Sequence, residues 1–259
     1  MSAVALPSPA LPAAAPNKWI VAASVTFGTL MGAIDTSIIN VALPHLRGAF
    51  SATTEEISWV STGYLLSAAV AMPLAAALSA WFGRKNVYLA GLQLFIVASI
   101  ACGLAPTLPV LVAARVLQGM GAGVLQPIEQ AILRETFPPK EQGMAMGIYG
   151  IAIMLGPAIG PTLGGYILDD HSWSWAFYVN VPVGLLGLGM VSRFVHDPPY
   201  LPRRRADIDA LGIALLVVGL GALHVLLERG ERLDWFESPS NVAGGAVALA
   251  SLSMFVAHE

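Results

Sequence analysis

Long apolar stretches separated by short polar segments dominate the chain. A helix that crosses a membrane needs about 20 predominantly apolar residues. Gly and Pro recur inside the stretches, as they do in membrane helices, and the runs are too long and unbroken for the alternating strands of a membrane β-barrel. The pattern therefore predicts an all-α polytopic membrane protein with eight spans. They cover residues 19–41, 57–79, 87–104, 108–131, 143–168, 175–194, 209–227 and 242–257.

The composition of the chain argues against the other broad classes. Of its 259 residues 56% are hydrophobic and 11% are charged, whereas about a quarter of a soluble domain is charged. Disorder would need low hydrophobicity and a high net charge. A net charge of −3 gives no reason to expect nucleic-acid binding. The single cysteine, Cys102, excludes a disulfide framework within the chain, and the scattered histidines and serines predict neither a metal site nor an enzyme.

The basic residues predict how the spans are oriented. Nine of the 13 Lys and Arg residues fall in the loops of one side, and loops rich in Lys and Arg stay in the cytoplasm. This places both the N-terminus and the C-terminus in the cytoplasm. The nine are Lys18, Arg84, Lys85, Arg134, Lys140, Arg193, Arg203, Arg204 and Arg205.

Loop lengths divide the chain into four parts. Residues 1–17 are rich in Ala and Pro and are expected to form a disordered cytoplasmic tail. Residues 18–194 form a six-helix domain, and six helices built from two inverted three-helix repeats are the half-unit of many secondary transporters. Residues 195–208 carry three prolines and an Arg run and form a cytoplasmic linker to a two-helix hairpin over 209–259.

Three ionisable residues, Asp35, Arg115 and Glu129, stand inside the predicted spans. Such residues are costly in a bilayer and normally face the bundle interior or a wet cavity. Asp35 and Arg115 each lie about 10 Å from the outer surface, on helices that run in opposite directions. At a shared depth they can pair, which lowers the cost of burying either charge.

Two roles are open for this pair. Desolvation and a neighbouring guanidinium act in opposite directions on the protonation of a carboxylate, so Asp35 can change its protonation state when its partner moves. This favours proton coupling. The alternative is a static ion pair that only locks the first helix to the fourth.

The fourth span carries a polar stripe that predicts a cavity wall. Arg115, Gln118, Ala122, Gln126 and Glu129 fall within about 80° of one another on a helix. Glu129 lies about 21 Å below Arg115, near the inner surface. There it either attracts a cationic substrate or simply sits in interfacial water beside Arg134, and the second interpretation is favoured.

The fifth span repeats glycine at helical spacing. Gly156, Gly160 and Gly164 form a ridge that permits close helix approach, and Pro157 and Pro161 add kinks. The ridge is either ordinary small-residue packing or a sliding face between two rocking halves of a carrier, and periodicity alone does not separate these interpretations.

Five segments together resemble one transporter family. They are IDTSIINVALP (34–44), RVLQGMGAGVLQP (115–127), LGPAIGPTLGGYI (155–167), SWSWAFYVNVPVG (172–184) and LLERGERLDWFESP (226–239). In order and spacing they resemble motifs of the major facilitator superfamily, in particular its fourteen-helix drug:proton antiporters of the EmrB/QacA type.

The resemblance implies alternating-access export of hydrophobic or cationic compounds across the bacterial inner membrane, driven by a proton gradient and without a cofactor. Asp35 and Arg115 would form the coupling pair, and Asn40, Gln118, Gln126 and Glu129 would line the cavity. EmrB-like members also imply a periplasmic adaptor and an outer-membrane channel as partners. The antiporter motif would comprise Gly156, Pro157, Gly160, Pro161, Gly164 and Gly165.

Two departures from the family pattern stand out. The loop after the second span reads AALSAWFGRKN, with Ala76, Ala80 and Trp81 at the family's Gly, Asp and Arg positions. Only the ending, Gly83, Arg84 and Lys85, matches, so the acidic member of the loop's charge latch is missing. The chain also stops after the eighth span, which suggests truncation with the second six-helix domain absent. A same-fold carrier for a metabolite or peptide and a truncated, non-transporting membrane scaffold are the alternatives.

Overall fold

A computed structural model describes residues 17–197, 209–230, 235 and 237–258 of the chain. The expected N-terminal tail and most of the expected linker, residues 198–208, lie outside the described residues. All regular secondary structure in the described part is helical. The helices are α1 (Lys18–Ala49), α2 (Thr54–Phe82), α3 (Arg84–Gly103), α4 (Leu108–Thr136), α5 (Gln142–Asp170, after the 3-10 turn Pro139–Glu141), α6 (Trp175–Tyr178), α7 (Asn180–Phe194), α8 (Ala210–Arg229) and α9 (Pro239–His258).

Within these described ranges, seven helical segments are long and apolar enough to cross a membrane, with α6 and α7 together counting as one. The remaining helix, α8, has a shorter apolar run over Leu211–Leu227. The predicted class, an all-α polytopic membrane protein with six helical spans and a hairpin, is therefore confirmed. α6 and α7 are joined through Val179, whose backbone is also helical, with φ −57° and ψ −27°. Only the bond that Pro182 cannot donate to the carbonyl of Tyr178 is missing between them.

Several helices, above all α1 and α2, extend beyond the apolar windows that predicted them. α2 begins with a capping box, in which the Thr53 hydroxyl accepts from the Glu56 N–H and the Glu56 carboxylate accepts from the Thr53 N–H. Such a cap satisfies backbone groups that a helix end leaves open. α1 likewise continues through Pro44 to Ala49. Hydropathy marks the membrane-buried part of a helix, whereas capping determines where the helix ends.

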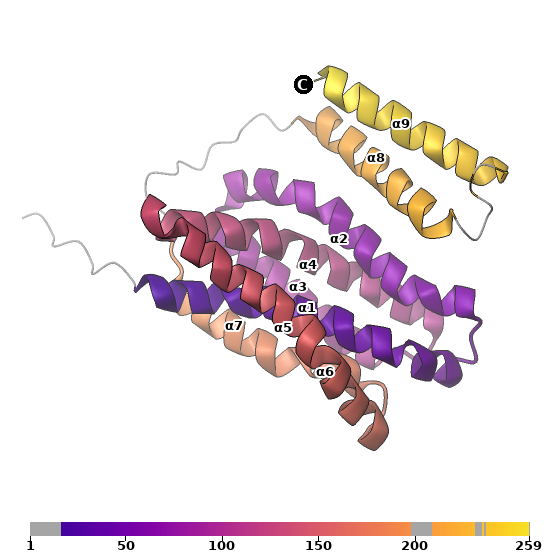
Figure 1. Cartoon of the computed structure of the whole chain (residues 1–259), viewed down its shortest axis with the longest axis horizontal. Helices are drawn as coiled ribbons and strands as arrows, with labels where there is room; N and C mark the ends of the chain where they lie inside the picture. Colours follow the sequence, from indigo (N-terminus) through magenta and orange to yellow (C-terminus); the bar gives the residue numbers. More distant parts are fainter. Residues whose placement is uncertain (1–16, 198–208, 231–234, 236, 259) are drawn as a thin grey trace, which may run out of the picture.

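The helices pack into a bundle with a hairpin at its side (Figure 1). α4 packs chiefly against α2 and α3, and α1 packs against α5 and α7. α8 and α9 pair with each other, and α8 contacts α2. Asp209 caps α8 by accepting from the Gly212 N–H at 2.8 Å, and its carboxylate meets His258 at the end of α9 at 2.9 Å. The amide of Gly212 first, and His258 second, hold the pKa of Asp209 below its usual value.

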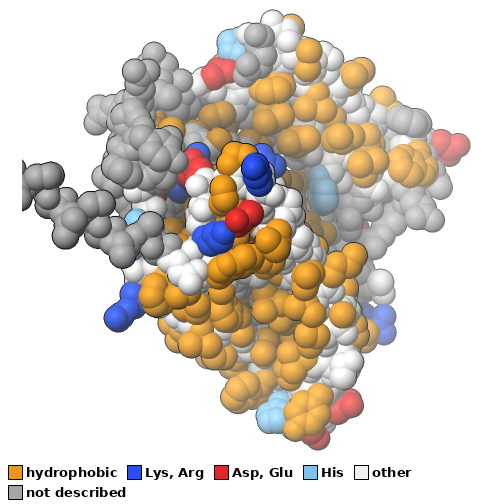
Figure 2. Space-filling model, turned by 60° about the vertical axis from the view of Figure 1, so that its left-hand side comes forward, with side chains coloured by type: hydrophobic (Ala, Val, Ile, Leu, Met, Phe, Trp, Pro, Cys, Tyr) orange, Lys and Arg blue, Asp and Glu red, His pale blue; other side chains and the backbone are white. Residues whose placement is uncertain are grey.

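The outer surface of the bundle is apolar. Figure 2 shows hydrophobic side chains over most of the visible face and only a few charged ones. Large side chains such as Val97, Met154 and Val256 are 64%, 71% and 74% exposed. A surface of this kind suits lipid and would be unstable in water.

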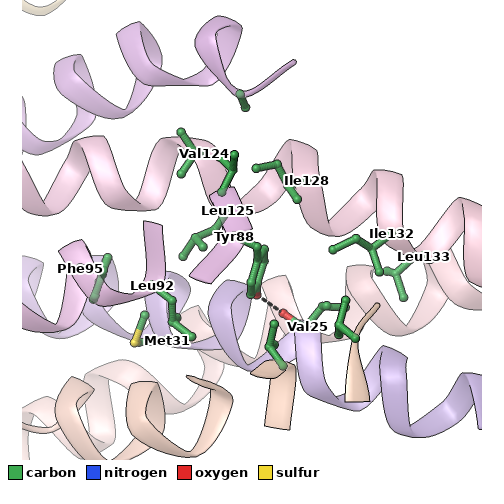
Figure 3. Packing of buried hydrophobic residues seen from close by; sticks show 14 of the residues in the cluster. Val25, Met31, Tyr88, Leu92, Phe95, Val124, Leu125, Ile128, Ile132 and Leu133 are labelled. Atoms are coloured by element: carbon green, nitrogen blue, oxygen red, sulfur yellow. Dashed lines mark hydrogen bonds between the residues drawn. The ribbon is translucent and has the colours of Figure 1, made fainter. Parts of the chain in front are cut away.

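Two apolar clusters form the interior, one toward each end of the bundle. The first is centred on α1, α3 and α4 and includes Val25, Tyr88 and Leu125 (Figure 3). The second includes Ile38, Leu111 and Phe177. Between the two clusters lies a layer of buried polar side chains, and this layer holds the candidate site.

Candidate functional site

The buried layer is built around an ion pair between α1 and α4. Arg115 Nη1 lies 2.7 Å from Asp35 Oδ2, and the two side chains are 1% and 0% exposed. The guanidinium also donates to the side-chain oxygen of Gln118 at 2.6 Å and to the backbone carbonyl of Val60 on α2 at 3.0 Å. The structure thus brings together the two charges that the depth argument paired.

Two further amides hold the Asp35 carboxylate. Gln118 Nε2 and Asn180 Nδ2 both donate to Asp35 Oδ1, at 3.0 and 2.7 Å. Gln118 Nε2 also donates to the Ser99 hydroxyl on α3 at 2.7 Å. Five helices therefore meet in one polar network. Every oxygen of Asp35 has a donor and its charge has a counter-ion, which together offset much of the cost of its burial.

Aromatic rings cover the guanidinium. The Tyr64 ring centroid lies 4.1 Å from the Arg115 guanidinium carbon, and that of Phe177 lies 5.9 Å away. At such distances a desolvated cation is attracted to the ring face. Sequence analysis did not single out Asn180, Ser99 or Tyr64. A signal for Asn180 was present in the sequence, because this residue lies inside the 172–184 segment that carries part of the family resemblance.

A cavity of about 490 Å³ lies beside this network, between α1, α2, α4 and α5. Asn40 and Gln126 line it, together with Thr36, Tyr64 and Pro157. Its volume is in the range of small-molecule pockets. Of the four residues expected to line a substrate cavity, Asn40 and Gln126 thus line this one.

Gln118 and Glu129, which were also expected to line a cavity, are not among the residues that line this one. Both side chains are fully buried in the bundle. The reason is the width of the α4 stripe. Gln126 and Gln118 stand at its opposite edges, about 80° apart, so one edge faces the cavity and the other faces the interior. The burial of Glu129 also disagrees with the favoured placement in interfacial water.

The glycine ridge of α5 packs against α1. A Cβ atom on Gly156 would collide with Ala33, and one on Gly160 would collide with Ser37. Gly164 lies in ordinary contact distance of Ile38, whereas a Cβ on Gly165 would meet nothing within 4 Å. Among the described residues the ridge thus packs α5 against α1. This is the contact that the small-residue packing interpretation expects. Pro161 is exposed.

The segment expected to form the loop after the second span is helical except at Gly83, because α2 ends at Phe82 and α3 begins at Arg84. The basic residues that begin α3 have acidic partners elsewhere in the chain. Asp197, which follows α7, accepts from the Lys85 N–H at 2.9 Å, and Arg84 pairs with Glu135 of α4. The Lys85 ammonium donates to the Ser192 carbonyl at 2.6 Å. Two distant acids therefore engage the start of α3, next to a helix end that lacks an acid at position 80.

Gly83 allows this arrangement, and we expect Gly83→Ala to destabilise the protein. Its φ of +84° is unfavourable for any other residue, and a Cβ there would collide with the Asp197 carboxylate. The expected loss is about 1–3 kcal/mol of unfolding free energy. Thermal unfolding in detergent measures it, with Gly143→Ala as the control because that position is helical and has open space around it. Equal effects of the two substitutions would contradict this account of the loop.

The sequence is similar to a family of membrane transporters. The profile of the Major Facilitator Superfamily matches residues 25–258. The fatty acid resistance protein FarB of Neisseria gonorrhoeae is 35% identical over 236 residues, which are 91% of this chain and 46% of that protein. The multidrug export protein EmrB of Escherichia coli K12 is 34% identical over 240 residues, 93% of this chain and 47% of that protein.

The chain thus spans about half the length of the curated relatives it matches. Among solved structures, a D-xylose–proton symporter superposes with a TM-score of 0.64 at 17% identity, covering 92% of this chain and 66% of the symporter. At that identity the likeness establishes the fold.

Proposed function

The chain belongs to the major facilitator superfamily and is a multi-pass membrane transporter protein, and from this we propose that it is the amino-terminal part of a proton-coupled multidrug exporter. The relatives FarB and EmrB support the export of toxic amphipathic compounds, because their names assign them fatty acid resistance and multidrug export. Alternating access would move the substrate outward while protons move inward.

One observation carries the proposal: a carboxylate and a guanidinium are buried together behind the wall of a cavity. Asp35 is balanced by Arg115, and Tyr64 stands between Arg115 and the cavity. Protonation of Asp35 would remove one charge of the pair and weaken its hold on α4. Because the pair joins α1 to α4, a proton that binds there changes the balance between arrangements of these helices.

The cavity supports a hydrophobic or cationic substrate. Its wall is mostly apolar, with the polar side chains of Thr36, Asn40 and Gln126 available for a few oriented contacts. We further propose that the protein lies in the bacterial inner membrane with both termini in the cytoplasm, and that a periplasmic adaptor and an outer-membrane channel complete the export path. The orientation follows the Lys and Arg bias of the loops.

The test is efflux of a lipophilic cationic dye from cells that produce the complete gene product. We expect Asp35→Asn to abolish the proton-driven part of efflux while the protein still inserts into the membrane. Asp170→Asn is the matched control, because this residue is an exposed acid at the end of α5. Collapse of the proton gradient with an ionophore should reduce the parent to the level of Asp35→Asn.

Undiminished proton-dependent efflux by the Asp35→Asn protein would overturn the coupling role. Loss of efflux in both the Asp35 and the Asp170 variant would point to a general defect rather than to coupling.

A further inference from the structure

Glu129 of α4 is a second carboxyl group in the bundle interior, and its surroundings contrast with those of Asp35. Asp35 has a cation and two amide donors. Glu129 is equally buried, and the hydroxyl of Thr29 on α1 donates to its Oε2. Its other oxygen, Oε1, has no hydrogen-bond partner among the described residues.

The groups that face Glu129 are neutral. Thr26 and Thr29 face it from α1, Tyr88 from α3, and Tyr149 from α5, where its hydroxyl bonds Gln130. No Lys or Arg of the described ranges lies within ion-pair distance of it. The side chains on the neighbouring turns of α4 belong to the apolar cluster of Figure 3, which includes Leu125 and Ile132.

An ionised carboxylate in such a place would be a bare charge in an apolar interior, which is far more costly than the neutral acid. The Thr26 hydroxyl, which faces Glu129, is also buried and has no hydrogen-bond partner among the described residues. It is a neutral group and supplies no counter-charge for a carboxylate.

We propose that Glu129 is a second proton-binding site, which holds a proton in the conformation described here while Asp35 is ionised. Two carboxyl groups in one domain with opposite environments divide such roles in proton-handling sites. A role of Glu129 in transport rests on the proposed function. Its protonation does not, because that is argued from the surroundings of the side chain alone.

The same cavity is lined by side chains that contact both sites. Thr29, the donor to Glu129, lines the cavity, and so does Tyr64, which covers Arg115. Each site therefore contacts a side chain that lines the cavity. A shift of α1 relative to α4 would break the Thr29–Glu129 bond and expose Glu129 to water, which favours loss of its proton.

Infrared spectroscopy of the chain in lipid tests the protonation directly. The carbonyl stretch of a neutral carboxyl group should be present at neutral pH and should decline as the pH is raised. We expect Glu129→Gln to remove this band, and Glu55→Gln, at an exposed acid of α2, to leave it unchanged. Asp35→Asn should also leave it unchanged, because Asp35 carries no proton in this conformation.

A second variant covers the case in which Glu129→Gln fails to fold. Thr29→Val removes one hydrogen bond to the carboxyl group, so it should shift the frequency of the band without removing it. An identical band in the parent, Glu129→Gln and Thr29→Val proteins would overturn the proposal. The infrared readout needs no transport, so the two proposals can fail separately. If the parent lacks the band while Asp35→Asn loses efflux, only the second site is refuted. If the parent shows the Glu129 band while Asp35→Asn keeps proton-dependent efflux, only the proposed function is refuted.

Discussion

Replacing Arg115 by methionine is expected to lower the free energy of unfolding by about 3–5 kcal/mol, the usual cost of removing one partner of a buried ion pair. The substitution keeps the side-chain volume but leaves the Asp35 carboxylate without its cation in a fully buried site. It also frees the carbonyl of Val60 and the side-chain oxygen of Gln118, which Arg115 bonds.

The double variant Asp35→Asn, Arg115→Met identifies the cause. If the bare carboxylate accounts for most of the loss, the double variant should be more stable than Arg115→Met alone. Thermal unfolding of the detergent-purified proteins, followed by the amount that remains monodisperse, provides the measurement. Arg47→Met is the control, because Arg47 is exposed at the C-terminal end of α1 and its side chain donates to the hydroxyl of Thr54, another exposed residue. A double variant less stable than Arg115→Met would mean that packing, and not charge, holds α1 to α4.

The ion pair could be predicted from the sequence because charges inside apolar spans are few. With Asp35 on an outgoing helix and Arg115 on an incoming one, depth alone was enough to match them. The remaining members of the network give no such signal. Ser99, Tyr64 and Asn180 are residue types that membrane helices tolerate at many positions, so only packing in three dimensions singles them out.

Two features could not be predicted from the sequence. One is the direction in which a side chain points around its helix, and the other is a contact between residues far apart in the chain. The α4 stripe is about 80° wide, and periodicity alone could not tell that Gln118 and Glu129 are buried in the bundle while Gln126 lines the cavity. Asp197, which accepts from the N–H of Lys85, lies 112 residues away from it in the sequence. No local sequence pattern relates the two residues. Helix ends were also displaced, because hydropathy does not report caps such as Thr53 and Glu56.

Gly156→Ala is expected to cost about 1–3 kcal/mol of unfolding free energy, since an added methyl group has no room where α5 crosses α1. Gly165→Ala, in the same motif, should change the stability by less than about 0.5 kcal/mol, because its Cβ would meet open space. Both substitutions have the same chemistry and the same helix, so their difference measures helix approach alone. The detergent unfolding assay provides the comparison, and equal stabilities of the two variants would contradict the close α1–α5 contact.

The same substitution is expected to reduce proton-driven efflux. Gly156 meets Ala33 and Gly160 meets Ser37, and these two residues of α1 flank Asp35 in sequence. At 100° per residue, Asp35 points about 160° away from both, toward α4. A methyl group that pushes α1 away from α5 therefore pushes Asp35 into its bonds with Arg115 and shifts the geometry on which proton binding depends. Gly156→Ala should lose efflux activity at expression levels where Gly165→Ala keeps it. Normal efflux by a folded Gly156→Ala protein would contradict this prediction, because it would mean that the packing of α5 on α1 does not affect the Asp35–Arg115 pair.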